Sequence, residues 1–143
     1  MKLFTIGYQA ATQAEVIARL KAAGVAILID VRAVAASRRA GFSKRLLAAG
    51  LAGAGIDYAH LRALGTPAAG RVAARAGRTA EMQALYTDYL DNEPAAQAEL
   101  EEAAEIAAAR PAALLCLEAD ARDCHRSLIA ARLAPRGFEV VDL

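Results

Sequence analysis

The stretch "VAILIDVR", residues 25–32, decides the fold class. It is an almost continuous apolar run, which predicts a strand that is buried on both faces. A strand of this kind fits a mainly parallel sheet that is covered by helices on both sides. Asp30 and Arg32 stand at the end of the run, where such a sheet presents its carboxyl edge to a ligand.

On either side of this stretch, the chain alternates strands with helices. We expect further strands at residues 3–7, 56–61, 112–118 and 138–143. Helices are expected between them, over residues 12–24, from Ser43 onward, around 82–90, from Asn92 to Pro111 and over 126–133. The alternation predicts one α/β domain over residues 1–143, a three-layer Rossmann-like fold with a mainly parallel five-stranded sheet in the order 3-2-1-4-5.

The connections between these elements carry local signals. Thr12 and Glu15 have the spacing of a capping box at the start of the first helix, and Asn92 is expected to cap a later one. Residues 63–79 contain three glycines and a proline, so we expect a long loop there, with at most one helical turn.

The composition indicates a folded protein. Of the 143 residues, 57% are hydrophobic and 23% are charged, which argues against disorder. No apolar run is long enough to cross a membrane, and "MKLFTIGYQA" turns polar too early for a signal peptide. With Cys116 and Cys124 as the only cysteines, we expect a cytoplasmic protein with two free thiols and no disulfide.

The charges are segregated along the chain. Residues 32–78 hold nine Lys and Arg residues against one acid, a net charge of +8, and residues 81–105 hold eight acids and no base. The two blocks either neutralise each other, within the fold or across an oligomer, or leave a basic face for a phosphate-bearing partner. Both interpretations fit the sequence.

Polar residues gather at one end of the predicted strands. Because the carboxyl ends of parallel strands meet at one edge of a sheet, these residues are expected to form a site. The first strand is followed by Gly7 and Tyr8, the second by Asp30 and Arg32, the third by His60, and the fourth by Glu118 and "CHRS", residues 124–127.

The "CHRS" stretch lies at the start of the last predicted helix. With Asp123 as the N-cap, the backbone N–H groups of Cys124, His125 and Arg126 are free to bind an anion, and Arg126 can clamp it. A cysteine in this position has a lowered pKa and can act as a nucleophile. The alternative is that Cys124 is a small buried apolar residue and Arg126 a salt-bridge partner of Glu118 or Asp30.

Other candidates have simpler explanations. Cys116 lies within a strand and is expected in the core. A zinc site formed by Glu118, Cys124 and His125 is disfavoured, because adjacent Cys and His residues are poor ligand spacing and a fourth ligand is missing. No metal ligand set is therefore assigned. The glycines form no G-x-G-x-x-G motif after a strand, so no dinucleotide or other cofactor is indicated.

Several motifs together resemble a known family. "TIGY" (5–8), "LIDVR" (28–32), "SRRAGFSKRLL" (37–47), "IDYAHLRALGTP" (56–67) and "LLCLEADARDCHRSLIA" (114–130) resemble the bacterial family catalogued as domain of unknown function 488. The resemblance implies a compact cytosolic α/β domain of unassigned activity. Its motif positions fall on Gly7, Asp30, Arg32, Ser37, Arg38, His60, Leu64, Gly65, Glu118, Cys124, His125 and Arg126.

This chain departs from the family pattern at two positions. Ala36 stands where the family usually has a proline, so Ser37 and Arg38 are held less rigidly. Tyr8 stands where the family often has a histidine, which removes that acid–base group.

Two functions fit these observations. The first is an enzyme acting on an anionic, phosphate-bearing substrate such as a nucleotide or nucleic acid. Cys124, Asp30, Glu118 and His60 are its candidate catalytic residues, and the substrate is expected to contact Gly7, Tyr8, Arg32, Ser37, Arg38, Gly65, His125, Arg126 and Ser127. The second is a nucleic-acid-binding module that uses the basic segment 32–78. An oligomer that pairs acidic helices with basic surfaces is a third interpretation.

Overall fold

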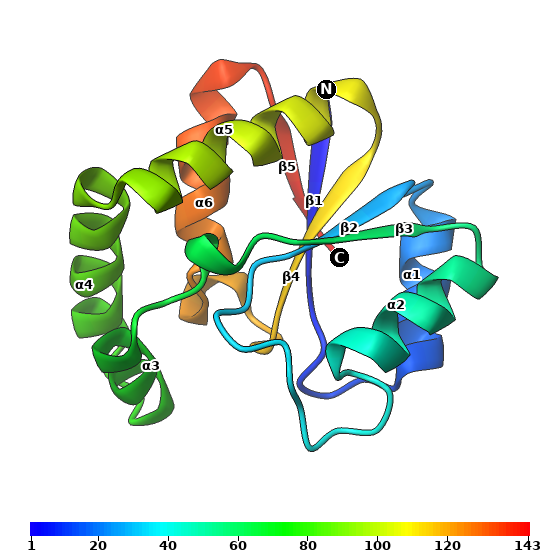
Figure 1. Cartoon of the computed structure of the whole chain (residues 1–143), viewed down its shortest axis with the longest axis horizontal. Coiled ribbons are helices and arrows are strands. Elements are labelled where there is room, and N and C mark those ends of the chain that lie inside the picture. The colour runs from blue at the N-terminus through cyan, green and yellow to red at the C-terminus, as the bar shows by residue number, and fades with distance from the viewer.

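A computed structural model describes residues 1–143, with a five-stranded parallel sheet at its centre (Figure 1). The strands are β1 (Lys2–Gly7), β2 (Ile27–Asp30), β3 (Asp57–His60), β4 (Ala112–Cys116) and β5 (Glu139–Asp142). All neighbouring strands pair in parallel. The α/β class, the parallel sheet and the five strands predicted from the sequence are confirmed.

The predicted strand order is wrong at one step. The observed order is β3-β2-β4-β1-β5, so β4 lies between β2 and β1 instead of beyond β1. The segment 61–111, which joins β3 to β4, returns the chain to the middle of the sheet. Every residue of β4 is buried, as its central place requires. The pairing of β4 with β1, which places Cys116 beside Gly7, agrees with the predicted order, whereas the pairing of β4 with β2 was not predicted.

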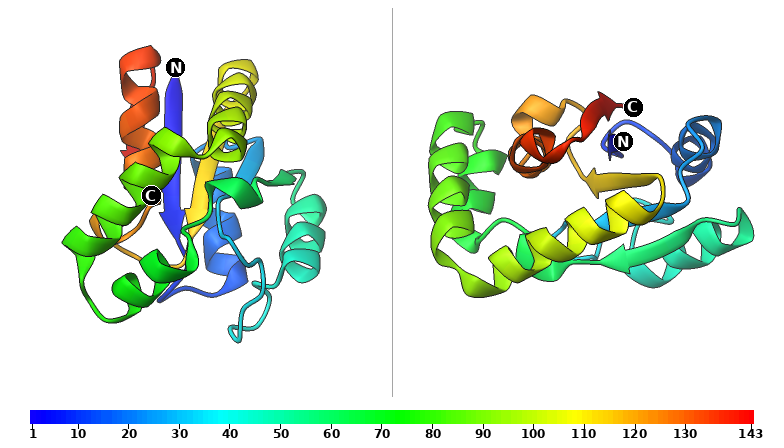
Figure 2. Two further views of the ribbon diagram at one scale, coloured as in Figure 1. Left: turned by 60° about the vertical axis from the view of Figure 1, so that its left-hand side comes forward. Right: turned by 90° about the horizontal axis from the view of Figure 1, so that it is seen from above.

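Helices cover both faces of the sheet. On one face, α1 (Gln13–Ala22) and α2 (Lys44–Gly53) pack through Val16, Leu20, Leu47 and Leu51 against β1, β2 and β4. On the other, α4 (Thr79–Asn92), α5 (Pro94–Ala109) and α6 (Arg126–Leu133) bury a second apolar cluster. Figures 1 and 2 show α1 and α2 together at one side of the molecule and α4 at the other. The three-layer prediction is therefore confirmed.

Helix ends agree in part with the sequence analysis. Thr12 and Glu15 form the predicted capping box at the start of α1. The cap of α5 is Glu93, one residue after the predicted Asn92, because Pro94 takes the first helical position.

The segment 63–79 is more ordered than predicted. It contains the end of a short 3-10 helix, η1 (Arg62–Leu64), and the two-turn helix α3 (Ala68–Arg75). The glycine and proline content suggested a loop, but Pro67 precedes the first turn of α3 and Gly77, with φ +75°, follows its end. Proline is common at the start of a helix and glycine just after its end, so both residues mark the termini of α3. The helix packs against α4.

None of the helices combines the length and the apolar character that a membrane crossing needs.

Candidate functional site

A pocket of about 210 Å³ opens at the carboxyl ends of the strands, where the sequence places its polar residues. Its walls come from the ends of β1, β2 and β4, from α3 and from the start of α6. Four residues predicted for the site line it, namely Tyr8, Arg32, Glu118 and His125. Arg71, Arg75, Thr66 and Cys116 line it as well and were not predicted as site residues.

Asp30 and Arg32 form a buried ion pair at the end of β2. The guanidinium meets the carboxylate with two nitrogens, Nε at 2.9 Å from Oδ1 and Nη2 at 2.7 Å from Oδ2. The Asp30 carboxylate also accepts hydrogen bonds from the Arg32 backbone N–H at 3.1 Å and the Tyr58 hydroxyl at 2.5 Å. Burial and the Asp30 carboxylate raise the pKa of Tyr58 above its usual range. Asp30 is therefore saturated with donors.

The rest of the Arg32 guanidinium is also engaged. Its Nη1 donates to the Tyr8 hydroxyl at 3.1 Å and to the Phe42 carbonyl at 2.7 Å, and Tyr8 stacks on Phe42. Burial alone favours the neutral form of Arg32, but the bonds to Asp30 outweigh it and raise the pKa. Arg32 faces the pocket, yet its donors are used to hold the loop after β2.

Two histidines bind consecutive carbonyls at the end of β2. His60 Nε2 lies 2.7 Å from the Arg32 oxygen, and His125 Nε2 lies 2.6 Å from the Val31 oxygen. Because a carbonyl only accepts, the Nε2 of each ring carries a proton, and in the neutral ring of His125 this leaves Nδ1 unprotonated. Burial lowers the pKa of His125 to about 4. His125 lines the pocket, whereas His60 does not.

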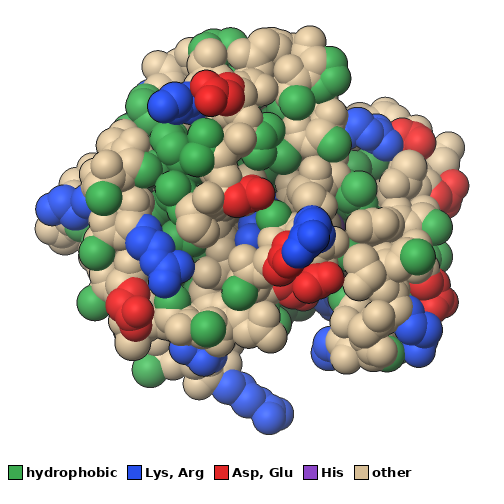
Figure 3. Space-filling view, turned by 180° about the vertical axis from the view of Figure 1, so that it is seen from behind, with side chains coloured by type: hydrophobic (Ala, Val, Ile, Leu, Met, Phe, Trp, Pro, Cys, Tyr) green, Lys and Arg blue, Asp and Glu red, His purple; other side chains and the backbone are tan.

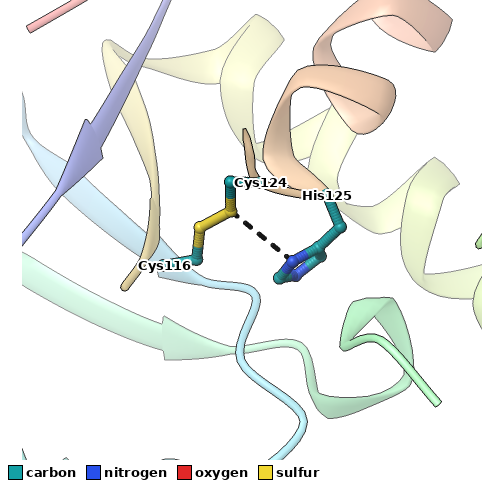
Figure 4. Close-up of side chains that lie close together, drawn as sticks. All are labelled: Cys116, Cys124 and His125. Atoms are coloured by element: carbon teal, nitrogen blue, oxygen red, sulfur yellow. Dashed lines mark hydrogen bonds between the residues drawn. A yellow bond between two sulfur atoms is a disulfide. The ribbon is translucent and has the colours of Figure 1, made fainter. Parts of the chain in front are cut away.

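Cys116 and Cys124 are joined through their sulfur atoms beside His125 (Figure 4). The prediction of two free thiols is thus wrong for this structure, because the end of β4 and the turn before α6 bring the two side chains together. Cys116 was expected to lie only in the core, but in the structure it also lines the pocket. The Cα atoms are 7.2 Å apart. This separation exceeds the range of about 4.4–6.8 Å that most disulfides span.

Arg126 is buried and holds the turn after β4. Its Nη1 donates to the Glu118 carbonyl at 2.6 Å and lies 3.2 Å from Cys116 Sγ, while Nη2 donates to the Ala119 carbonyl at 3.2 Å. Burial lowers its pKa. The helix α6 begins at Arg126 with His125 as N-cap, so the prediction of Asp123 as N-cap is wrong. Asp123 ends a separate 3-10 turn, η2 (Ala121–Asp123).

Glu118 is the half-buried carboxyl group of the pocket. Burial raises its pKa, and a hydrogen bond from its own backbone N–H and the charge of Arg126 only partly oppose this. A carboxyl group whose pKa is raised toward neutrality is suited to proton transfer. Its Oε2 lies 3.5 Å from Cys116 Sγ.

The remaining predicted residues shape the loops. Ser37 accepts from the Arg39 backbone N–H at 3.1 Å, Ser127 donates to the Cys124 carbonyl at 2.9 Å, and neither lines the pocket. Arg38 is exposed and lies outside the pocket.

The two predicted glycines are sites of close backbone approach. A Cβ on Gly7 would overlap the Glu118 carbonyl, and a Cβ on Gly65 would overlap the Ala33 backbone. Their role is to let β4 and the loop after β3 reach the site.

The sequence does contain a signal for Arg71 and Arg75, but it can be recognised only when residues 68–75 are known to form a helix. Arg71 and Arg75 are four residues apart, which places them on one face of that helix. Neither forms an ion pair with a carboxylate, and Arg71 Nη1 donates only to the Thr66 carbonyl, at 2.9 Å. The prediction of a loop over residues 63–79 concealed this arrangement.

The fold and the pocket define a class, a three-layer α/β protein with a polar site at the carboxyl edge of its parallel sheet. A family model described as "Domain of unknown function DUF488" matches residues 12–133, and the protein belongs to this family. The resemblance drawn from the motifs is thereby confirmed. Neither the comparison with curated proteins nor the comparison with solved structures returned a match.

Proposed function

We propose that the protein is an enzyme that binds a small phosphate ester in the pocket at the carboxyl edge of the sheet. One observation carries the proposal: Arg71 and Arg75, two arginines without carboxylate partners, line the same pocket as the half-buried Glu118. Arginine is the side chain that best matches phosphate, because its planar fork donates two parallel hydrogen bonds.

The size of the pocket limits the substrate class. Its volume of about 210 Å³ lies below the range of about 300–1,000 Å³ that drug-sized ligands occupy. The pocket therefore suits a phosphate monoester, or the phosphate end of a nucleotide whose base remains outside.

The proposed roles follow from which pocket side chains are not already paired with other charged groups of the protein. Arg71 and Arg75 hold the phosphate, and Glu118 transfers a proton to or from the reacting oxygen. Arg32 lines the wall, but Asp30 neutralises its charge and its hydrogen bonds remain with Asp30, Tyr8 and Phe42. Cys124 is not a wall residue, so this proposal assigns it no covalent step.

Substituting the two α3 arginines is expected to weaken phosphate binding. Each of Arg71→Ala and Arg75→Ala should lower the affinity for inorganic phosphate and a nucleoside monophosphate by about 10- to 100-fold, since a hydrogen bond to a charged group contributes about 1.5–3 kcal/mol. Isothermal titration calorimetry measures the affinity. Arg38→Ala is the matched control, because Arg38 belongs to the same basic segment but lies outside the pocket.

An equal loss in all three variants would argue for general surface charge instead of this pocket. No detectable binding of either probe to the unmodified chain would refute the proposal.

Glu118→Gln tests the proton-transfer role. The variant keeps the size and polarity of the side chain, so it should bind phosphate as the parent does. It should turn over a responsive phosphate ester about 100-fold more slowly, because positioned acid–base groups contribute about 10²–10⁴-fold to rates. Product release across a panel of esters gives the rates, with Asp123→Asn, another carboxyl group of the pocket wall, as the control. Equal rates for Glu118→Gln and its parent would remove Glu118 from the mechanism.

A nucleic-acid-binding module is a second candidate, and one observation favours it. Of the nine basic residues in segment 32–78, only Arg32 and Arg78 form an ion pair with an acid. On the face seen in Figure 3, however, basic and acidic side chains are intermingled and form no continuous basic patch. DNA and RNA binding that falls steeply with salt and survives Arg71→Ala would favour the module.

A further inference from the structure

Three donor groups that bind soft metal ions converge beside the pocket. Cys116 ends β4, Cys124 follows η2, and His125 is the N-cap of α6. Their ligand atoms all lie within 4.8 Å of one another, and all three residues are buried (Figure 4). In a tetrahedral zinc site with Zn–S bonds of about 2.3 Å and Zn–N bonds of about 2.0 Å, the donors lie about 3–4 Å apart. The two sulfurs are bonded to each other in this structure, so the cluster reaches this geometry only after reduction, when the sulfurs separate from about 2 Å to about 3.8 Å.

The hydrogen bonds of His125 prepare its ring for a metal. Nε2–H donates to the Val31 carbonyl at 2.6 Å, which leaves the lone pair on Nδ1. Nδ1 is the atom that faces the sulfurs, 3.6 Å from Cys124 Sγ. A histidine that binds a metal usually donates its other ring N–H to a carbonyl or carboxylate in this manner, which fixes both tautomer and orientation.

The backbone and the neighbouring charge suit two separate thiolates. The Cα separation of 7.2 Å is longer than most disulfides span, about 4.4–6.8 Å, so the backbone does not specifically favour a bridge. Arg126 Nη1 lies 3.2 Å from Cys116 Sγ and can donate a hydrogen bond to a thiolate there. A guanidinium in that position stabilises the anionic sulfur that a metal ion requires.

A metal ion held by these three residues would have its fourth position toward the pocket. Cys116 and His125 both line the pocket wall, and Glu118 Oε2 lies 3.5 Å from Cys116 Sγ. Three protein ligands with one open position is the arrangement of catalytic zinc sites, including those with two cysteines and one histidine. Glu118 or a pocket ligand can complete the set.

We propose that the reduced pair Cys116 and Cys124, together with His125, binds one Zn²⁺ ion whose fourth position faces the pocket. Two thiolates and a neutral imidazole balance the charge of the ion. The site shares the pocket of the proposed function but does not depend on it, because metal binding can be measured without any substrate.

The test uses the full chain, reduced with a phosphine and freed of metal under nitrogen. Co²⁺ serves as the spectroscopic probe, since thiolate ligation produces a sulfur-to-cobalt charge-transfer band in the near ultraviolet. We expect one Co²⁺ per chain, displaced by one Zn²⁺. Cys116→Ser, Cys124→Ser and His125→Gln should each weaken Zn²⁺ binding about 100-fold.

His60→Gln is the matched control. His60 binds the Arg32 carbonyl as His125 binds the neighbouring Val31 carbonyl, but it is not part of the sulfur cluster. Its substitution should leave Zn²⁺ affinity unchanged. An equal loss in His60→Gln and His125→Gln would overturn the proposal, as would the absence of one-to-one binding by the reduced parent chain.

A measurement on the parent chain tests the proposal even if the variants fail to fold. Zn²⁺ at one equivalent should slow alkylation of both thiols, because metal-bound sulfur is a poor nucleophile. Unchanged alkylation rates would contradict the proposal. Phosphate binding by Arg71 and Arg75 is measured separately, so either proposal can fail while the other holds.

Discussion

Asp30→Asn is expected to lower the free energy of unfolding by about 3–5 kcal/mol, the usual cost of removing one partner from a buried ion pair. The carboxylate is fully buried and neutralises Arg32 through two hydrogen bonds of 2.9 and 2.7 Å. An asparagine leaves the Arg32 charge in the protein interior without compensation. Urea denaturation monitored by circular dichroism measures the change.

Two further variants distinguish the ion pair from ordinary packing. Tyr58→Phe removes a single hydrogen bond to the Asp30 carboxylate and should cost about 1.5–3 kcal/mol, less than Asp30→Asn. The double variant Asp30→Asn/Arg32→Met removes both charges, so it should be more stable than Asp30→Asn by about 1 kcal/mol or more, a coupling typical of groups in contact. If the double variant is the less stable of the two, the isolated charge is not the cause of the loss.

The sequence was informative about the edge of the sheet where the pocket lies. Each strand that ends at the pocket is followed by glycine or polar residues, and parallel strands must end together. That rule needs no knowledge of strand order, which is why the position of the pocket could be predicted although the strand order was wrong.

Strand order depends on contacts that are distant in sequence. The pairing of β2 with β4, which the predicted order lacked, joins segments about 85 residues apart, and the close approach of β1 to the residues after β4 requires Gly7, where a side chain would collide with the Glu118 carbonyl. A glycine at the end of a strand is also expected for a simple turn, so the sequence alone does not distinguish a turn from a close approach of two strands.

Four of the residues that line the pocket could be predicted, but not which arginines lack a carboxylate partner. Arg32 and Arg126 were expected to bind an anion. In the structure Arg32 donates to Asp30 and Tyr8, and both Nη atoms of Arg126 donate to backbone carbonyls, so that only the buried Nε of Arg126 lacks a partner. Arg71 and Arg75 line the pocket from one face of α3 and form no ion pair, and Arg71 Nη1 donates only to the Thr66 carbonyl. The partners of a guanidinium are set by tertiary packing, which no local pattern encodes.

The neutral state of His125 makes the fold sensitive to acid. Burial lowers the pKa of His125 from 6.5 to about 4, so below pH 6.5 the unfolded chain binds a proton that the folded chain does not. The contribution of neutral His125 to the free energy of unfolding is fully present above pH 6.5 and is lost as the pH falls toward 4. The difference in pKa corresponds to about 3 kcal/mol.

The comparison with His125→Gln isolates this effect from the other acid-titrating groups. Glutamine does not titrate, so the variant should be less stable than the parent at pH 7, and the gap should shrink by about 3 kcal/mol by pH 4. Denaturation curves at each pH, with a chelator and a reductant present, give the gap. Tyr86→Phe removes a hydroxyl from the ring that packs on His125, so it should lower stability by a similar amount at every pH. Parallel pH profiles for His125→Gln and the parent would show that the buried imidazole is not the origin of acid sensitivity.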